Sequence, residues 1–149
     1  MDLDAAAVLR APPERVFAEV ADLSTYPEWL GIVHAAEPAP PHDGDQGPAW
    51  MVDLGARLGP LRRTKRVRMV RTEQHRPKLV RFEREEHDGR THSAWILTAE
   101  VEVDGNGSRL TLRLHYGGAL KVPAVELVLR EEIRRAGDRL QRRLAASTR

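Results

Sequence analysis

Residues 11–33, APPERVFAEVADLSTYPEWLGIV, carry the strongest structural signal in this chain. The two prolines open a helix, because a proline in the first turn sacrifices no helical hydrogen bond. An apolar face then repeats at helical spacing, at Val16, Phe17, Val20 and Leu23. Ser24 is placed to cap a second helix over 25–30, which ends at Gly31. The stretch therefore predicts two short helices in succession.

Strand-like segments lie on both sides of these helices. Residues 1–10 alternate loosely, and further strands are predicted at 32–36, 49–55, 61–73, 79–86, 93–103 and 110–116. Turn signals separate them, in a proline- and glycine-rich loop at 38–48, turns at 57–60 and 74–78, and hairpin signals at 87–90 and 104–107. A long helix over 122–146 closes the chain, with an inner stripe formed by Val125, Leu129, Ile133 or Glu132, Ala136, Leu140 and Leu144.

This order of elements predicts an α+β fold. A curved antiparallel sheet of about six to seven strands would wrap around the long C-terminal helix, with two short helices after the first strand. At 149 residues, of which 41% are hydrophobic, the chain fits a single domain over 1–149 with a sizeable core.

Composition excludes several classes of function. The chain has no cysteine, which excludes disulfides and thiolate chemistry and fits a cytoplasmic protein. Residues 1–9 have no long apolar run, so we expect neither a signal peptide nor a membrane span. The basic segment 62–71 lacks aromatic residues for base stacking, and we predict no nucleic-acid partner. We expect its arginines to form cross-strand ion pairs, with Glu83, Glu85, Glu100 and Glu102.

Signals for metal or nucleophilic chemistry are missing as well. A zinc site needs three or four converging ligands, and no metal-ligand spacing relates His34, His42, His75, His87, His92 and His115. The serines have no G-x-S-x-G context. We predict no metal and no cofactor, and the sequence assigns no catalytic residue.

One phrase of the sequence resembles a known superfamily. The pattern P-x-x-V-F-x-x-V-A-D-L-x-x-Y-P-x-W is matched from Pro13 to Trp29, and the strand pair over 95–116 and the final helix fit it too. The chain resembles START/SRPBCC proteins, in particular the polyketide cyclase/dehydrase and lipid-transport-like group that is common in actinobacteria. That resemblance implies a helix-grip fold with a pocket between the last helix and the concave face of the sheet. It does not specify an activity, since members bind lipids, cyclise polyketides or act as co-chaperones.

The resemblance and the strand alternation together predict the lining of that pocket. Its apolar members are Trp50, Val52, Leu54, Val67, Met69, Val80, Phe82, Trp95, Leu97, Leu112, Leu114, Val125 and Leu129. The alternative is that these residues simply fill a core, which alternation cannot distinguish from a pocket.

Three polar groups share the predicted apolar face. By strand parity Arg84 points with Phe82, Tyr116 points with Leu114, and Trp95 contributes an indole N–H. Arg84 would bind a carboxylate of a fatty or polyketide-like ligand, because an unpaired buried charge is costly. Alternatively it is solvated at the rim or pairs with Glu85 or Asp88.

Three functions remain open from the sequence. The first is binding of a hydrophobic small molecule, lipid or polyketide-like, by a monomer or homodimer. The second is a polyketide aromatase, cyclase or dehydrase acting in the same cavity, with Arg84, Tyr116 and Tyr26 as polar groups that assist enolisation. The third is a non-catalytic interaction protein whose cavity has collapsed.

Overall fold

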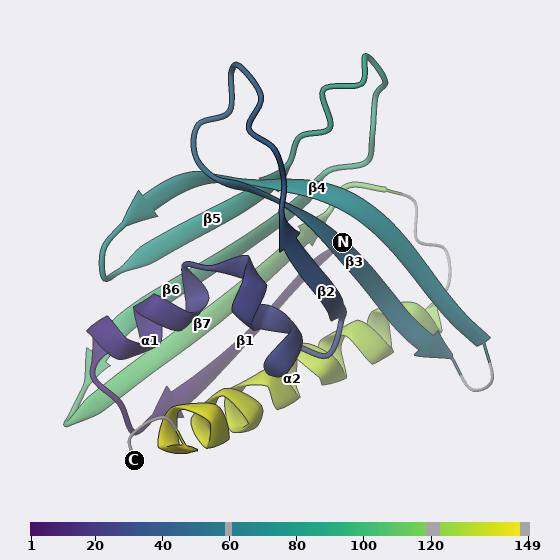
Figure 1. Ribbon diagram of the computed structural model, residues 1–149. Helices are drawn as coiled ribbons and strands as arrows, with labels where there is room; N and C mark the ends of the chain where they lie inside the picture. Colours follow the sequence, from purple (N-terminus) through teal and green to yellow (C-terminus); the bar gives the residue numbers. More distant parts are fainter. Residues whose placement is uncertain (59–60, 119–122, 147–149) are drawn as a thin grey trace.

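The computed structural model describes residues 1–58, 61–118 and 123–146, with side chains over 1–55, 64–118 and 126–146. A curved, fully antiparallel sheet is its main element (Figure 1). Within the described residues the strand order is β1-β7-β6-β5-β4-β3-β2. The strands are β1 (Asp2–Leu9), β2 (Val33–Pro38), β3 (Ala49–Leu58), β4 (Leu61–His75), β5 (Leu79–Arg84), β6 (Trp95–Asp104) and β7 (Gly107–Tyr116). The helices are α1 (Pro13–Val20), the 3-10 helix η1 (Leu23–Glu28) and α2 (Pro123–Ala146). The predicted α+β, helix-grip fold is confirmed.

The two short helices form as predicted, but the residue that caps the second helix is not the one expected. Pro12 precedes α1 in an extended conformation and Pro13 occupies its first turn. Ser24 was predicted to cap the second helix, and this is wrong: the Asp22 carboxylate accepts from the Ser24 backbone N–H at 3.0 Å. Asp22 takes the role because its extended backbone aims the side chain at the free N–H groups of η1, whereas Ser24 already lies inside the helix.

Several strand limits differ from the prediction. A turn was predicted at 57–60, but β3 continues to Leu58 and β4 begins at Leu61. Residues 59–60 lie outside the described residues. The strands on either side of the hairpin signal at 87–90 do pair antiparallel, but their connection is longer than a tight turn, because β5 ends at Arg84 and β6 begins only at Trp95. The connection is long because Glu86 and His87 bind partners outside it. Glu86 binds the backbone of Arg68 and His87 binds Asp45, within a cluster of ion pairs described below.

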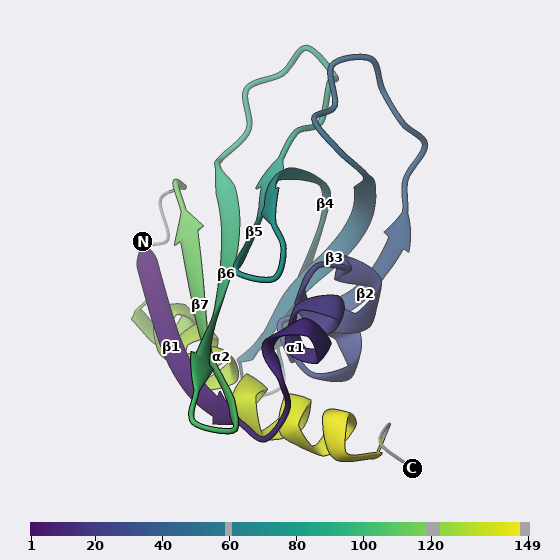
Figure 2. The ribbon, with the colours of Figure 1, turned by 90° about the vertical axis from the view of Figure 1, so that its left-hand side faces the viewer.

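The sheet curves enough for one helix to reach both of its ends. α2 contacts β1, which is an edge strand, and also β3, which is next to the opposite edge. A bulge between Arg71 and Glu73 of β4 contributes to this curvature, since an extra residue bends its strand. Figure 2 shows α2 lying under the lower end of the sheet, close to α1 and η1. No helix in the described part of the chain is long and apolar enough to cross a bilayer.

The core fills the concave side from two directions. The inner stripe of α2 is buried, at Leu129, Ile133, Ala136, Leu140 and Leu144. Small residues allow α2 to approach β1 closely, since a Cβ on Gly137 would collide with the side chain of Ala7. From the other side, the rings of Tyr26 and Trp29 are fully buried, and Tyr26 meets Phe82 edge-on at 5.9 Å between centroids. Both α2 and η1 therefore contribute buried side chains to the core on the concave side of the sheet.

Candidate functional site

One transverse row of side chains crosses the concave face of the sheet. Its members are defined by strand register: Trp50 pairs with Met69, and Met69 pairs with Arg84. On the other strands Trp95 pairs with Tyr116. The β5–β6 pairing ends at Glu83 and Ile96, so Arg84 and Trp95 are the next residues along these two strands. Five of the predicted site residues, Trp50, Met69, Arg84, Trp95 and Tyr116, therefore come together, and we call them the concave row.

The other predicted lining residues lie beside this row or deeper in the core. They are buried, with Leu54 only partly so: Val52, Val67, Val80, Phe82, Leu97, Leu112, Leu114 and Leu129. Leu112 lies where α2 packs onto β1 and β7, and the space there is only about 10 Å³. The side chain of Val125 lies outside the described residues. Leu112 therefore belongs to the helix–sheet contact, and the concave row is the better candidate site.

Trp95, between Arg84 and Tyr116 in the row, carries an unsatisfied donor. The residue is 8% exposed, and its indole N–H has no hydrogen-bond partner among the described residues. Its ring lies 4.5 Å from that of Tyr116, tilted by 49°. A buried donor left in this state costs about 1–3 kcal/mol. An oxygen atom supplied by a ligand would remove that cost.

Arg84 is buried on the row and already has partners. Its Nε donates to the Glu86 carboxylate at 2.7 Å, and its Nη1 donates to the backbone oxygen of Ser93 at 3.3 Å. The sequence named Glu85 or Asp88 as a possible partner, and this is wrong. The chain turns after β5 so that Glu86 comes back over the sheet, where it also accepts from the backbone N–H of Arg68 at 3.1 Å.

Tyr26 belongs to the core and not to the row. Its phenol donates to the backbone oxygen of Val20 at 2.7 Å. Burial, and secondly the charge of Asp22, raise the pKa of Tyr26 far above its usual range. A fully buried phenol with a fixed partner holds η1 against α1 and is unsuited to assist proton transfer.

A polar cluster that the sequence did not reveal lies beyond the strand ends. The Arg68 guanidinium binds the Asp45 carboxylate at 2.7 and 3.0 Å, and His87 Nε2 lies 2.9 Å from the same carboxylate. The rings of His42 and His87 stack at 3.9 Å. Hydrogen bonds from Arg68, which come first, and from His42 and His87 hold the pKa of Asp45 well below its usual range. The cluster ties the 39–48 loop to the 85–94 connection, and Figure 1 shows the two segments rising together.

The same cluster has the composition of a partial metal site. One ligand atom each of Asp45, Glu85 and His87 lies within 4.8 Å of the others. However, Arg68 already occupies both oxygens of Asp45, so a cation would compete with a guanidinium. No spacing rule could have found this group, because Asp45 and His87 lie in irregular segments 42 residues apart.

The arginines of β4 pair with partners other than those expected. Arg66 binds Asp53 of the neighbouring strand at 2.9 Å, and Arg68 binds Asp45. Both partners are aspartates on the β2–β3 side and not the glutamates of β5 and β6. Arg66 thus forms a cross-strand ion pair as predicted, but its partner is Asp53 and not one of the predicted glutamates.

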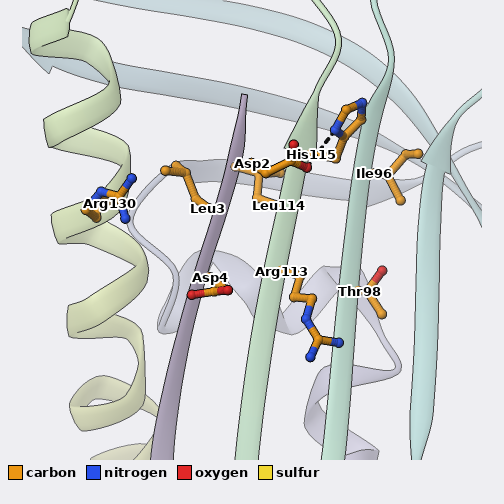
Figure 3. Close-up of a pocket in the computed structure, with 9 residues that line it drawn as sticks. All are labelled: Asp2, Leu3, Asp4, Ile96, Thr98, Arg113, Leu114, His115 and Arg130. Atoms are coloured by element: carbon orange, nitrogen blue, oxygen red, sulfur yellow. Dashed lines mark hydrogen bonds and ion pairs between the residues drawn. The ribbon is translucent and has the colours of Figure 1, made fainter.

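A polar pocket of about 350 Å³ lies at the β1 edge of the sheet, mainly on the convex side (Figure 3). It is formed by β1, β6, β7 and Arg130 of α2. Most of the charged groups there are already paired, with His115 Nδ1 at 2.8 Å from Asp2, Arg113 bound to Glu100 and Arg130 bound to Glu126. This face is an array of exposed ion pairs, and it does not hold the polar groups that the sequence predicted for a ligand.

Comparisons with known proteins agree with the fold. A family model described as polyketide cyclase / dehydrase and lipid transport matches residues 2–146. A search of curated proteins finds no match.

Solved structures share the fold over the whole chain. TTHA0849 from Thermus thermophilus is 18% identical, with 100% of each chain covered and a TM-score of 0.74. A START superfamily protein from Mycobacterium smegmatis is 13% identical, with 98% of each chain covered and a TM-score of 0.71. The ginseng major latex-like protein 151 from Panax ginseng is 10% identical, with 96% of each chain covered and a TM-score of 0.67. At these identities the likeness concerns the fold alone.

Proposed function

The chain belongs to the polyketide cyclase/dehydrase and lipid transport family, and we propose that it binds a hydrophobic small molecule, a lipid or a polyketide-like compound, between the concave face and α2. The observation that carries this proposal is the buried indole N–H of Trp95, which has no partner among the described residues. Most buried polar groups in protein cores are satisfied, and among the described side chains only Trp95 Nε1 and Thr72 Oγ1 are buried without a partner. A donor left open beside apolar side chains is what a binding site for an apolar ligand with one oxygen function requires.

The concave row supplies the remaining contacts. Trp50 and Met69 offer apolar surface on one side of Arg84, and Trp95 and Tyr116 offer aromatic surface on the other. Burial of apolar ligand surface contributes about 25 cal/mol per Å². Most of the affinity would thus come from surface burial, and the indole N–H would orient the ligand.

A cyclase or dehydrase activity is the second candidate, and it would use the same row. It is favoured by the phenol of Tyr116, which lies beside Trp95 and against the backbone of Gly118. Two neutral donors side by side could stabilise an enolate oxygen as it forms. Turnover of a poly-β-keto substrate, lost in Tyr116→Phe with binding retained, would establish this activity over simple binding.

The first experiment is native mass spectrometry of the purified chain, with organic extraction of any bound compound. We expect an apolar compound in substoichiometric or full amount, and reduced retention in Trp95→Leu. A matched control is Ile96→Leu, the next residue of the same strand, which faces away from the row. A clean apo mass together with no binding of fatty-acid, ester or aromatic polyketide panels would refute the proposal and favour a non-catalytic interaction protein.

A further inference from the structure

The charge of Arg84 is balanced within the protein before any ligand arrives. Its side chain is 5% exposed, and that of its partner Glu86 is 15% exposed. The contact at 2.7 Å joins Nε to one carboxylate oxygen, and Nη1 is directed to the Ser93 carbonyl. A ligand therefore meets an ion pair on the concave row and not a free cation.

Glu86 is fixed in this position by a second bond. Its other oxygen, Oε1, accepts from the backbone N–H of Arg68, a residue of the sheet itself. To release Arg84, Glu86 would have to abandon a buried backbone donor as well as a guanidinium. Both losses are costly, so the pair stays closed during ligand binding.

A carboxylate brought to Arg84, in the middle of the row, would be repelled. It would lie next to the Glu86 carboxylate, and the neighbouring cation Arg68 is itself bound to Asp45. The ligand would lose its hydration without gaining an unengaged positive partner, which is unfavourable in a buried site.

A neutral oxygen finds the opposite situation at Trp95. The indole N–H is buried and unpartnered among the described residues, and it can donate to a ketone, ester, ether or hydroxyl oxygen. This contact brings no charge into the core. We infer that the concave row selects apolar ligands that carry a neutral oxygen function and discriminates against the corresponding carboxylic acids. The inference rests on the proposed function and specifies its ligand class.

The test uses probes that differ only at the polar end. Undecane, 2-undecanone, methyl decanoate and decanoate are titrated at pH 7.5 into the full chain, with binding followed by displacement of a fluorescent apolar dye. We expect the ketone and the ester to bind about tenfold more tightly than decanoate, since one net hydrogen bond corresponds to roughly that factor. In Trp95→Phe, the ketone should fall to the affinity of undecane.

A gain of function tests the role of the ion pair. Glu86→Gln removes the charge that masks Arg84 while keeping an acceptor for the backbone of Arg68, and decanoate should then bind about tenfold more tightly than in the parent chain. Glu83→Gln is the matched control, because Glu83 lies on the same strand and faces away from the concave row. It should leave all four affinities unchanged.

The outcomes separate this inference from the function that underlies it. Decanoate binding more tightly than the ketone in the parent chain overturns the inference and leaves the proposed function standing. No binding of any probe, undecane included, refutes the proposed function and the inference with it. If Glu86→Gln does not fold, Arg84→Met with Glu86→Leu replaces it. The preference for the ketone must persist in that variant, and its loss would show that Arg84 had bound the oxygen.

Discussion

Arg68 of β4 holds Asp45 of the β2–β3 loop through two hydrogen bonds, at 2.7 and 3.0 Å. Their side chains are only 10% and 6% exposed. The same carboxylate lies 2.9 Å from His87 in the 85–94 connection. One aspartate thus fastens two loops to the sheet beside the concave row.

Asp45→Asn should lower the free energy of unfolding by about 2–3 kcal/mol, because a nearly buried guanidinium loses its charged partner. Urea denaturation at neutral pH measures this change. Asp43→Asn serves as the control, since Asp43 is an exposed residue of the same loop. Equal loss in both variants would mean that the loop, and not the pair with Arg68, determines the effect.

The same carboxylate should make stability depend on acid. The hydrogen bonds from Arg68 hold the pKa of folded Asp45 below its usual value, which is about 3.9 in the unfolded chain. Its contribution is therefore fully present above pH ~5, and it is lost progressively as the pH falls below ~4 towards the folded pKa. The stability difference between the parent chain and Asp45→Asn should still be present at pH 5 and shrink below pH 4. A difference that stays constant down to pH 2.5 would contradict the assignment.

Removal of the hydroxyl group should mainly lower stability at Tyr26 and mainly affect ligand affinity or turnover at Tyr116. Tyr26→Phe leaves the buried carbonyl of Val20 without its donor, so we expect a loss of about 1–2 kcal/mol in stability and no change in ligand affinity. Tyr116→Phe should change stability little and ligand affinity or turnover more, because Tyr116 lies on the concave row. Thermal melts and probe titrations on both variants measure the two effects. A reversed pattern would move the site away from the row.

The contact between Gly137 and Ala7 limits how closely α2 packs on β1. Gly137→Ala gains about 1 kcal/mol of helix propensity, but its new Cβ meets the Cβ of Ala7. Overpacking costs about 1–3 kcal/mol, so we expect net destabilisation. Combining it with Ala7→Gly should recover stability beyond the sum of the single changes, measured by urea unfolding as a double-mutant cycle. Asp138→Ala on the exposed side of α2 is the control, and additive single effects would show that the helix and strand do not limit each other.

Local patterns in the sequence were sufficient to predict the helices and strands and the face of the sheet on which each strand side chain lies. The 11–33 stretch predicted two helices because proline position and apolar spacing act over a few residues. Alternation placed Arg84, Trp95 and Tyr116 on the same face of the sheet, since side chains in a strand alternate whatever lies around them. The same rule turns His115, the neighbour of Tyr116, to the outer face of the sheet, where its Nδ1 lies 2.8 Å from Asp2.

The hydrogen-bond or ion-pair partner of a side chain depends on which distant segments meet in the fold. Local sequence patterns carry no information about which segments meet. Arg84 was expected to bind a ligand, to be solvated at the rim or to pair with Glu85 or Asp88, and the path of the chain after β5 gave it Glu86 as its partner instead. Asp45 reached Arg68 and His87 only because the two long connections lie next to each other beyond the strand ends.

The order of residues was enough to specify the α+β fold and the side of the sheet on which each strand residue lies, because propensity and alternation are short-range properties of the chain. Long-range packing set which charges are neutralised and which donor remains open. Hydrogen bonds form between atoms within about 3 Å, and the path of the backbone through space sets those distances. The paired Arg84 and the open indole N–H of Trp95 are both results of that packing.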